Sequence, residues 1–108
     1  MDTDSNLVKG TVDTIILKML HSKAMYGYEI IRTVNELTDG RFAWKEGSLY
    51  PALHRLENDG MIAGEWRINE GERPRKYYLI TRKGLKALSS KTRQWTEFAE
   101  TVNALLLV

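Results

Sequence analysis

The period of the hydrophobic residues changes at Gly60, and this change restricts the fold more than any other feature of the sequence. Before Gly60, apolar residues recur every three or four positions and predict three helices, at about residues 7–20, 27–37 and 48–59. After Gly60, the pattern predicts a strand, a loop that contains a glycine and a returning strand, at residues 62–68, 69–73 and 75–80. A two-stranded hairpin is therefore expected to follow three helices.

Capping and turn residues predict where these elements begin and end. Ser5 or Asn6 is expected to cap the first helix, and Ser48 the third, which places Pro51 in the first turn of that helix. Gly60 is expected to end the third helix in a left-handed conformation, and Pro74 to begin the returning strand. Residues 21–25 are expected to form a connection, and residues 41–44 a very short strand.

A long helix is predicted from Arg82 to the end of the chain, with Thr81 as its cap. Its apolar and small residues alternate at spacings of three and four, as in a heptad seam: Leu85, Leu88, Thr92, Trp95, Ala99, Val102 and Leu106. A helix of about 25 residues is about 37 Å long, which is longer than the small domain from which it extends. We expect this seam to pair with the same helix of a second copy, and Val8 and Val12 of the first helix to join the interface.

The order of these elements predicts an α+β, mainly α fold. It is the order of a winged helix-turn-helix with a long C-terminal dimerisation helix. Residues 1–81 are expected to form the DNA-binding part, including the N-terminal helix, and residues 82–108 the dimerisation helix, within one compact domain.

Composition excludes several classes of protein. The chain has 108 residues and no cysteine, which excludes disulfides and thiolate metal sites and suits the cytoplasm. The polar, acidic residues 1–6 do not form a signal peptide, and no apolar run reaches the ~18 residues of a membrane span. No cofactor is expected, and neither His21 nor His54 has the neighbours of a metal site. The net charge is only +2, but six basic residues and no acid lie between Arg73 and Lys86.

The third helix carries the strongest functional signal. Leu49, Leu53 and Leu56 form a buried stripe, while the opposite face carries short, stiff or planar groups instead of flexible lysines and glutamates. This pattern is typical of a recognition helix in the major groove of DNA, but an ordinary amphipathic core helix would fit it equally well.

Candidate DNA contacts come from three parts of the chain. The third helix supplies five of them: Ser48, Tyr50, Pro51, His54 and Arg55. The wing supplies Arg73, Arg75 and Lys76, and the second helix supplies Tyr28. Arg55 could bind a guanine edge or, more often in such interfaces, a phosphate. Each has an alternative. His54 could be a surface histidine without a function, and the wing could be a solvated charged hairpin. Tyr28 could be a core tyrosine. Trp44 and Trp66 are expected to pack in the core or the wing.

Several motifs together resemble one family. Tyr-Gly-Tyr-Glu-Ile at residues 26–30, Gly-Ser-Leu-Tyr-Pro-Ala-Leu-His-Arg-Leu-Glu at 47–57, Gly-Met-Ile at 60–62 and Arg-Lys-Tyr-Tyr at 75–78, with Thr81 and Gly84, closely resemble the PadR family of bacterial transcriptional regulators. The resemblance runs from about Lys9 to Trp95, and the chain looks like the small subfamily with a single C-terminal helix. It implies a homodimeric repressor that binds an inverted-repeat operator in double-stranded DNA.

The resemblance also implies a ligand site. In a multidrug-binding member of the small subfamily, a tryptophan from each last helix sandwiches planar aromatic ligands, and Trp95 stands at the matching place. Thr92 and Ala99 are small neighbours that would leave a flat slot. Ala99 replaces an acidic residue of that member, so a preference for cationic ligands does not carry over. The alternative is that Trp95 is a plain interface anchor.

Two other functions remain to be compared with a DNA-binding repressor. A winged helix can instead bind another protein through its third helix and hairpin, although a lysine-rich patch is atypical of protein interfaces. An enzyme is disfavoured, because the sequence has no nucleophile–base pair, phosphate loop or metal cluster.

Overall fold

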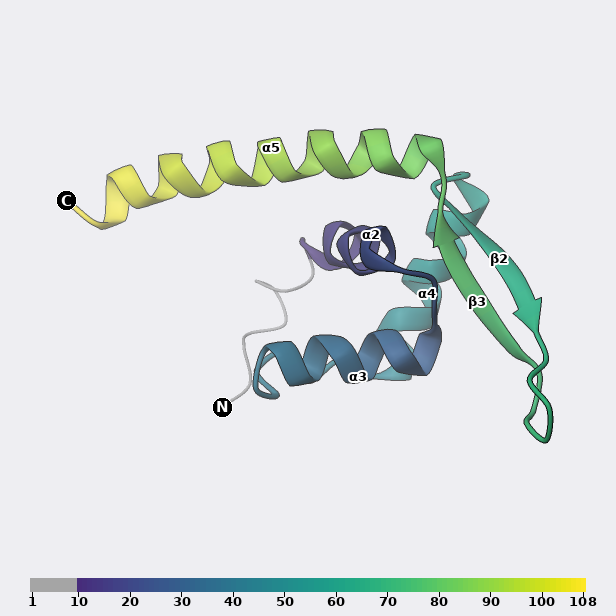
Figure 1. Cartoon of the computed structure of the whole chain (residues 1–108). Coiled ribbons are helices and arrows are strands. Elements are labelled where there is room, and N and C mark those ends of the chain that lie inside the picture. Colours follow the sequence, from purple (N-terminus) through teal and green to yellow (C-terminus); the bar gives the residue numbers. More distant parts are fainter. Residues whose placement is uncertain (1–9) are drawn as a thin grey trace.

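The computed structural model describes residues 10–108. The elements in order are α2 (Val12–Ser22), β1 (Met25–Tyr26), α3 (Gly27–Leu37), α4 (Glu46–Asn58), β2 (Ile62–Arg67), β3 (Arg75–Ile80) and α5 (Arg82–Leu106). Figure 1 shows α5 lying across one side of the molecule, α2 beneath it, α3 and α4 further below, and the β2–β3 hairpin extending from the end opposite the C-terminus. This arrangement confirms the predicted winged helix-turn-helix with a long C-terminal helix.

The core forms around α2, which carries the fully buried Ile16 and Leu17. This helix packs against α5, β3 and α4, so the protomer itself covers much of its apolar surface. The stripe predicted on α4 is confirmed, since Leu49, Leu53 and Leu56 are all buried. Leu88 of α5 also belongs to this core, while Val12 packs against its edge.

The sheet has the strand order β1-β3-β2, with both pairings antiparallel. The β1 strand was not predicted, because two residues at the end of the expected connection and directly after it are too few to show a period. Met25 pairs with Tyr78 and Tyr26 with Tyr77, and α3 begins at the next residue. This third strand therefore fixes the start of α3 against the wing.

Four predicted boundaries differ in the structure. Within the described residues the first helix begins at Val12 after a turn at Gly10 and Thr11, because glycine disfavours a helix interior; Ser5, Asn6, Val8 and Lys9 lie outside the described residues. Lys45, not Ser48, is the N-cap of α4, so Pro51 lies in the second turn instead of the first. The first wing strand ends at Arg67 instead of residue 68, and Pro74 precedes the returning strand instead of beginning it, although that strand covers the predicted residues 75–80.

The predicted short strand at residues 41–44 is wrong. This segment is irregular, and Ala43 has a left-handed φ of 49°. The side chain of Asn35 holds it instead, donating to the Trp44 carbonyl at 3.0 Å and accepting from the Trp44 backbone N–H at 2.8 Å. A long-range side-chain contact of this kind leaves no periodic signal in the sequence.

The end of α4 and the start of α5 are joined by several contacts. Gly60 adopts the predicted left-handed conformation, with a φ of 75°. The Thr81 hydroxyl accepts from the Gly84 N–H at 3.1 Å, as predicted for a cap, and donates to the Gly60 carbonyl at 2.7 Å. A side chain at Gly84 would overlap the carbonyl of Met61, so α5 leaves the body at one fixed place.

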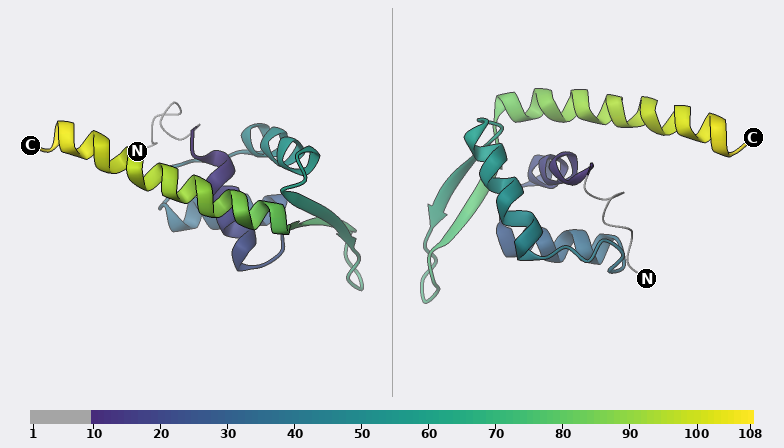
Figure 2. Two further views of the ribbon diagram at one scale, coloured as in Figure 1. Left: turned by 90° about the horizontal axis from the view of Figure 1, so that it is seen from above. Right: turned by 180° about the vertical axis from the view of Figure 1, so that it is seen from behind.

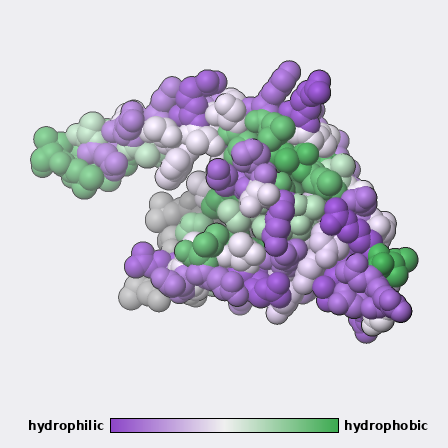
Figure 3. Space-filling model, in the orientation of Figure 1, coloured by the Kyte–Doolittle hydropathy of each residue, from purple (hydrophilic) through white to green (hydrophobic). Residues whose placement is uncertain are grey.

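The long helix projects beyond the rest of the protomer. Seen from above and from behind, α5 passes over the body and continues past it (Figure 2). In the view of Figure 3, hydrophobic residues gather at the free end of α5 and over the middle of the molecule, whereas the hairpin is mostly hydrophilic with one hydrophobic patch at its outer edge. Four large apolar side chains at this end are exposed: Leu105, Leu106, Leu107 and Val108.

Candidate nucleic-acid interface

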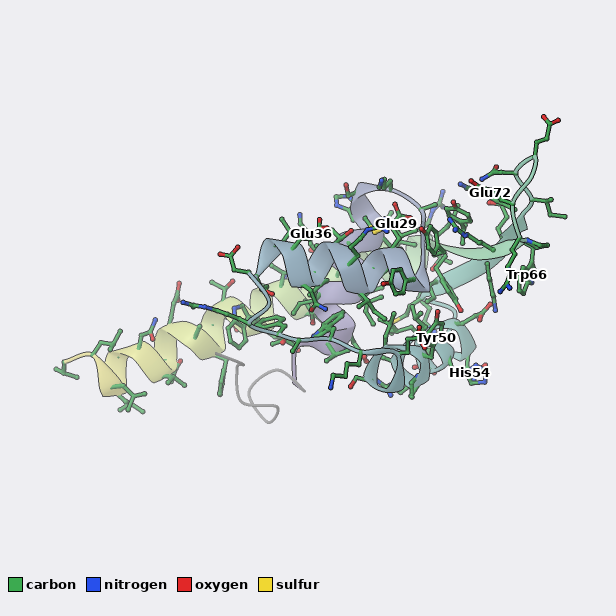
Figure 4. All side chains as sticks on the ribbon, turned by 90° about the horizontal axis from the view of Figure 1, so that it is seen from below. Glu29, Glu36, Tyr50, His54, Trp66 and Glu72 are labelled. Atoms are coloured by element: carbon green, nitrogen blue, oxygen red, sulfur yellow. The ribbon has the colours of Figure 1, made fainter. Side chains whose placement is uncertain are left out.

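One face of α4 is buried and the other is exposed, as expected for a helix that presents side chains to a partner. Ser48, Tyr50, Pro51, His54 and Arg55 are all exposed. Figure 4 shows Tyr50 and His54 on α4 and Trp66 on the wing. Pro51 has no N–H to donate to the Gly47 carbonyl one turn earlier, so that acceptor remains available on the exposed face.

Tyr50 lies against the first residue of α3. A methyl group added to Gly27 would come within 2.5 Å of the Tyr50 hydroxyl oxygen, so only glycine leaves room for this ring. Burial, and then the nearby Glu46 carboxylate, raise the pKa of the Tyr50 hydroxyl above its ordinary value. A tyrosine hydroxyl is protonated near neutral pH with or without this shift, so that of Tyr50 can donate to an acceptor such as a phosphate.

Arg55 is paired within the chain. Its Nη2 atom lies 2.7 Å from Oδ1 of Asp13, which joins α4 to α2. Both side chains are partly exposed, so the ion pair contributes little stability and can be exchanged. A DNA phosphate that binds Arg55 would have to share its guanidinium with the Asp13 carboxylate or displace that carboxylate.

Lys76 lies away from the wing tip and joins the wing to α4. Its Nζ atom donates to Glu57 Oε1 at 2.9 Å, and this hydrogen bond is the main cause of the raised pKa of Lys76. The far end of the Lys76 side chain passes over Gly64, so a side chain at this position would make Lys76 shift. Burial likewise raises the pKa of the neighbouring Tyr78. The predicted role of Lys76 as a phosphate contact therefore competes with a structural ion pair.

The wing carries arginines of two kinds. Arg67 pairs with Glu65 at 3.0 Å and lies over the Tyr77 ring. Arg73 and Arg75, by contrast, have no carboxylate partner within residues 10–108, and Arg75 lies 4.4 Å from the centre of the Tyr26 ring. The turn between the strands also contains Glu72, which accepts from Asn69 at 3.3 Å (Figure 4).

Trp66 is not packed as predicted. Trp44 is buried, but Trp66 is 67% exposed and Ile68 is also exposed. Ile62, Gly64 and Trp66 alternate along β2 toward the same side, yet α4 covers only the beginning of that strand. The sequence pattern gives the side on which a residue lies but not how far the neighbouring helix extends.

The predicted ligand residues lie on the projecting part of α5. Trp95 is 51% exposed, and its ring centre is 6.3 Å from that of Phe98. Thr92 is exposed, while Ala99 and Val102 are half-buried. Of the other predicted interface residues, Leu85 and Leu106 are exposed, but Leu88 is buried in the core of its own protomer.

Among residues 10–108, no group of three or more His, Cys, Asp or Glu side chains could hold a metal ion. None of the helices described is sufficiently long and apolar to span a bilayer.

Comparison with known proteins identifies the family. Residues 16–90 match the transcriptional regulator PadR-like family. The chain belongs to the PadR-like family of transcriptional regulators. It is 36% identical over 86 residues to the transcriptional regulator Rv3488 of Mycobacterium tuberculosis, covering 80% of this chain and 79% of that protein. The resemblance stated from the motifs is thereby confirmed.

Solved structures support the same conclusion. A transcriptional regulator from Clostridium thermocellum superposes with a TM-score of 0.89 at 36% identity, covering 96% of this chain and 98% of that one. The PadR-like transcriptional regulator BC4206 from Bacillus cereus superposes with a TM-score of 0.82 at 35% identity, covering 94% and 97%. This PadR-like chain therefore shares nearly its whole length with those regulators, the long α5 included.

The structure adds residues that sequence reasoning missed in this PadR-like regulator. Asp13 and Glu57 hold two of the predicted basic contacts, and Arg32 lies beside the wing arginines. Glu57 ends the motif at residues 47–57, but no local pattern predicts these contacts, because each of the three residues acts on a residue at least 19 positions away or on another element. Only the third strand, which brings α3 beside the wing, reveals Arg32.

Proposed function

We propose that this regulator binds an inverted-repeat operator in double-stranded DNA as a homodimer. The observation that carries the proposal is the exposed polar face of α4 beside a wing whose Arg73 and Arg75 lack carboxylate partners within the described residues. A major groove admits an α-helix, and a wing can reach the adjacent minor groove or backbone.

The side chains of α4 would take different parts in recognition. His54 and Ser48 can hydrogen-bond to base edges or phosphates, and Pro51 can contact a thymine methyl group. Tyr50, held against Gly27, offers its protonated hydroxyl to the backbone. Arg55 would leave Asp13 for a phosphate, because an exposed ion pair is weak enough to exchange.

The homodimer would form through α5. Trp95, Phe98 and Leu106 are exposed on a helix that projects from the body, which is costly for an isolated protomer. A second α5 packed along the heptad seam would bury them. A two-fold axis through the paired helices would then present two α4 helices to the two halves of one operator.

The slot for a planar aromatic ligand would lie between two Trp95 rings. Thr92 and Ala99 are one turn away on either side and leave space, while Phe98 adds a second ring near each tryptophan. A ligand inserted there would change the separation of the two α4 helices. Because half-sites have a fixed spacing of about 34 Å, such a change would release the operator.

Gel retardation with the DNA upstream of the protein's own gene tests DNA binding. We expect the wild type to retard this duplex at low salt, with log affinity falling linearly as log salt rises. The double variant Arg73→Glu/Arg75→Glu should lose retardation. A matched variant, Arg41→Glu/Arg93→Glu, makes the same charge change at two exposed arginines outside the site and should lose less.

The same variants separate this proposal from a protein-binding winged helix. If the wild type does not retard DNA even at low salt, DNA binding is wrong and a protein partner becomes the better hypothesis. If both double variants lose retardation equally, net charge and not the wing accounts for binding.

A further inference from the structure

The third strand of the sheet creates a cavity that joins α3 to the wing. Because β1 pairs with β3 and leads directly into α3, the first turns of α3 lie next to the start of β3. Tyr28 and Arg32, four residues apart, share one face of α3 and line this cavity together with Tyr26. The wing contributes Arg73, Pro74 and Arg75 on the other side.

The arginines of this cavity differ from the other basic residues near α4 and the wing. In the described structure, Arg55, Arg67 and Lys76 are each paired with a carboxylate. None of the ion pairs between residues 10 and 108 involves Arg32, Arg73 or Arg75, although Glu72 also lines the cavity. Three guanidinium groups against one carboxylate leave the cavity with an excess of positive charge.

The cavity is also partly pre-organised. The guanidinium of Arg75 is held over the Tyr26 ring at 4.4 Å, which restricts its orientation. The Glu72 carboxylate is occupied by the Asn69 amide. Tyr28 is 55% exposed, so its hydroxyl can reach a group that enters from outside.

We infer that this cavity, with Arg32 as a previously unassigned member, holds a phosphodiester group of the operator backbone. The inference rests on the proposed function. Arginine forms paired hydrogen bonds with phosphate oxygens, and a tyrosine hydroxyl can add a third. The position favours DNA over a small anion, because Tyr50 of α4 packs against Gly27, the residue before Tyr28. A duplex engaged by α4 therefore brings its backbone next to the cavity, and Glu72, one of the residues that line it, is labelled on the wing in Figure 4.

Affinity measured as a function of salt tests Arg32 specifically. Arg32→Gln should weaken binding about five- to tenfold, equally for operator and unrelated duplex, since a phosphate contact carries no sequence information. The slope of log affinity against log salt should become shallower by about 0.9 for each protomer. Arg41→Gln removes the same charge from an exposed arginine outside the cavity and should leave the slope unchanged.

Two further measurements make the result decisive. Arg32 is exposed, so Arg32→Gln should unfold at the wild-type urea concentration, and a loss of affinity then reports the contact. Phosphate should weaken wild-type DNA binding more than chloride does at equal ionic strength, because free phosphate competes with the DNA backbone for the cavity, and Arg32→Gln should abolish this difference. A difference of the same size in wild type and Arg32→Gln would place the competition outside the cavity and would overturn the inference.

The outcomes also distinguish this inference from the proposed function. If the wild type retards DNA but Arg32→Gln matches Arg41→Gln in affinity and slope, the cavity is not a backbone site. If the wild type retards no DNA, the proposed function fails and the cavity loses its ligand with it.

Discussion

Single residues in this protein are constrained by contacts across elements more than by their neighbours in sequence. Gly27 leaves room for the Tyr50 ring of α4, and Gly64 lies where the far end of the Lys76 side chain passes toward Glu57. The sequence shows these glycines but not their reason. The exposed residues of α4 could be predicted from helical spacing alone, whereas the pairing of Arg55 with Asp13, 42 positions apart, could not.

Replacing Gly27 by alanine should destabilise the protein despite alanine's higher helix propensity. The added methyl group would displace the Tyr50 ring, and overpacking of this kind costs about 1–3 kcal/mol. Gly47→Ala is the control, because that position in α4 has open space and should gain up to about 1 kcal/mol. Urea denaturation measures both. Equal effects of the two substitutions would show that Tyr50 does not depend on Gly27.

Stability should fall at alkaline pH. The pKa of Tyr78 is raised above 10.0 in the folded state, mainly by burial, so the unfolded state loses its proton first and is favoured as the pH rises past 10. The raised pKa of Lys76 acts in the same direction above 10.5, because its stabilising charge is lost as the pH rises through the folded value. Tyr78→Phe should therefore flatten the decline in unfolding free energy above about pH 10. An unchanged decline in this variant would contradict the assignment to Tyr78.

At the scale of elements, the helices and the hairpin follow from hydrophobic period, but their junctions do not. The segments that predicted α3, α4, the hairpin and α5 are long enough to show a period. The β1 strand has two residues, and the segment before α4 is held by Asn35, so neither could be recognised. The α4–α5 junction is the exception, because Gly60 and Thr81 carry conformational signals of their own.

Thr81→Ala should cost about 1–2 kcal/mol of stability. It removes both the cap of α5 and the hydrogen bond to the Gly60 carbonyl, which together connect α5 to the end of α4. Thr96→Ala serves as a control, since that exposed hydroxyl bonds only to the Thr92 carbonyl of its own helix. Thermal unfolding compares the two. A smaller loss for Thr81→Ala than for Thr96→Ala would show that the junction does not stabilise the fold.

At the scale of the whole molecule, the shape is more extended than that of a compact chain, as the proposed homodimer would require. The radius of gyration is 15.2 Å, whereas a compact chain of this length has about 13 Å, and the projecting α5 accounts for the difference. Its exposed apolar residues point to a partner, and the family suggests a second copy. The sequence predicted this seam, but not that Leu88 would be used by the protomer's own core.

Placing charge on the seam should separate the protomers. Trp95→Asp/Leu106→Asp puts carboxylates at two exposed seam positions and should weaken dimerisation about a hundredfold or more, given the burial energy of such side chains. Gln94→Asp/Asn103→Asp places the same groups on exposed neighbours outside the seam. Light scattering after size exclusion gives the mass of each variant. If the variant with charged seam residues still has the mass of a dimer, the interface lies elsewhere on the protomer.

The central claim is that two protomers, joined through α5, read one duplex together through α4 and the wing. Sedimentation equilibrium of the wild-type protein with a labelled duplex from upstream of its own gene measures this most directly. The account predicts two protomers for each duplex at low salt, and loss of the complex when the seam carries Trp95→Asp/Leu106→Asp. A complex with one protomer for each duplex, or no complex at all, would contradict it.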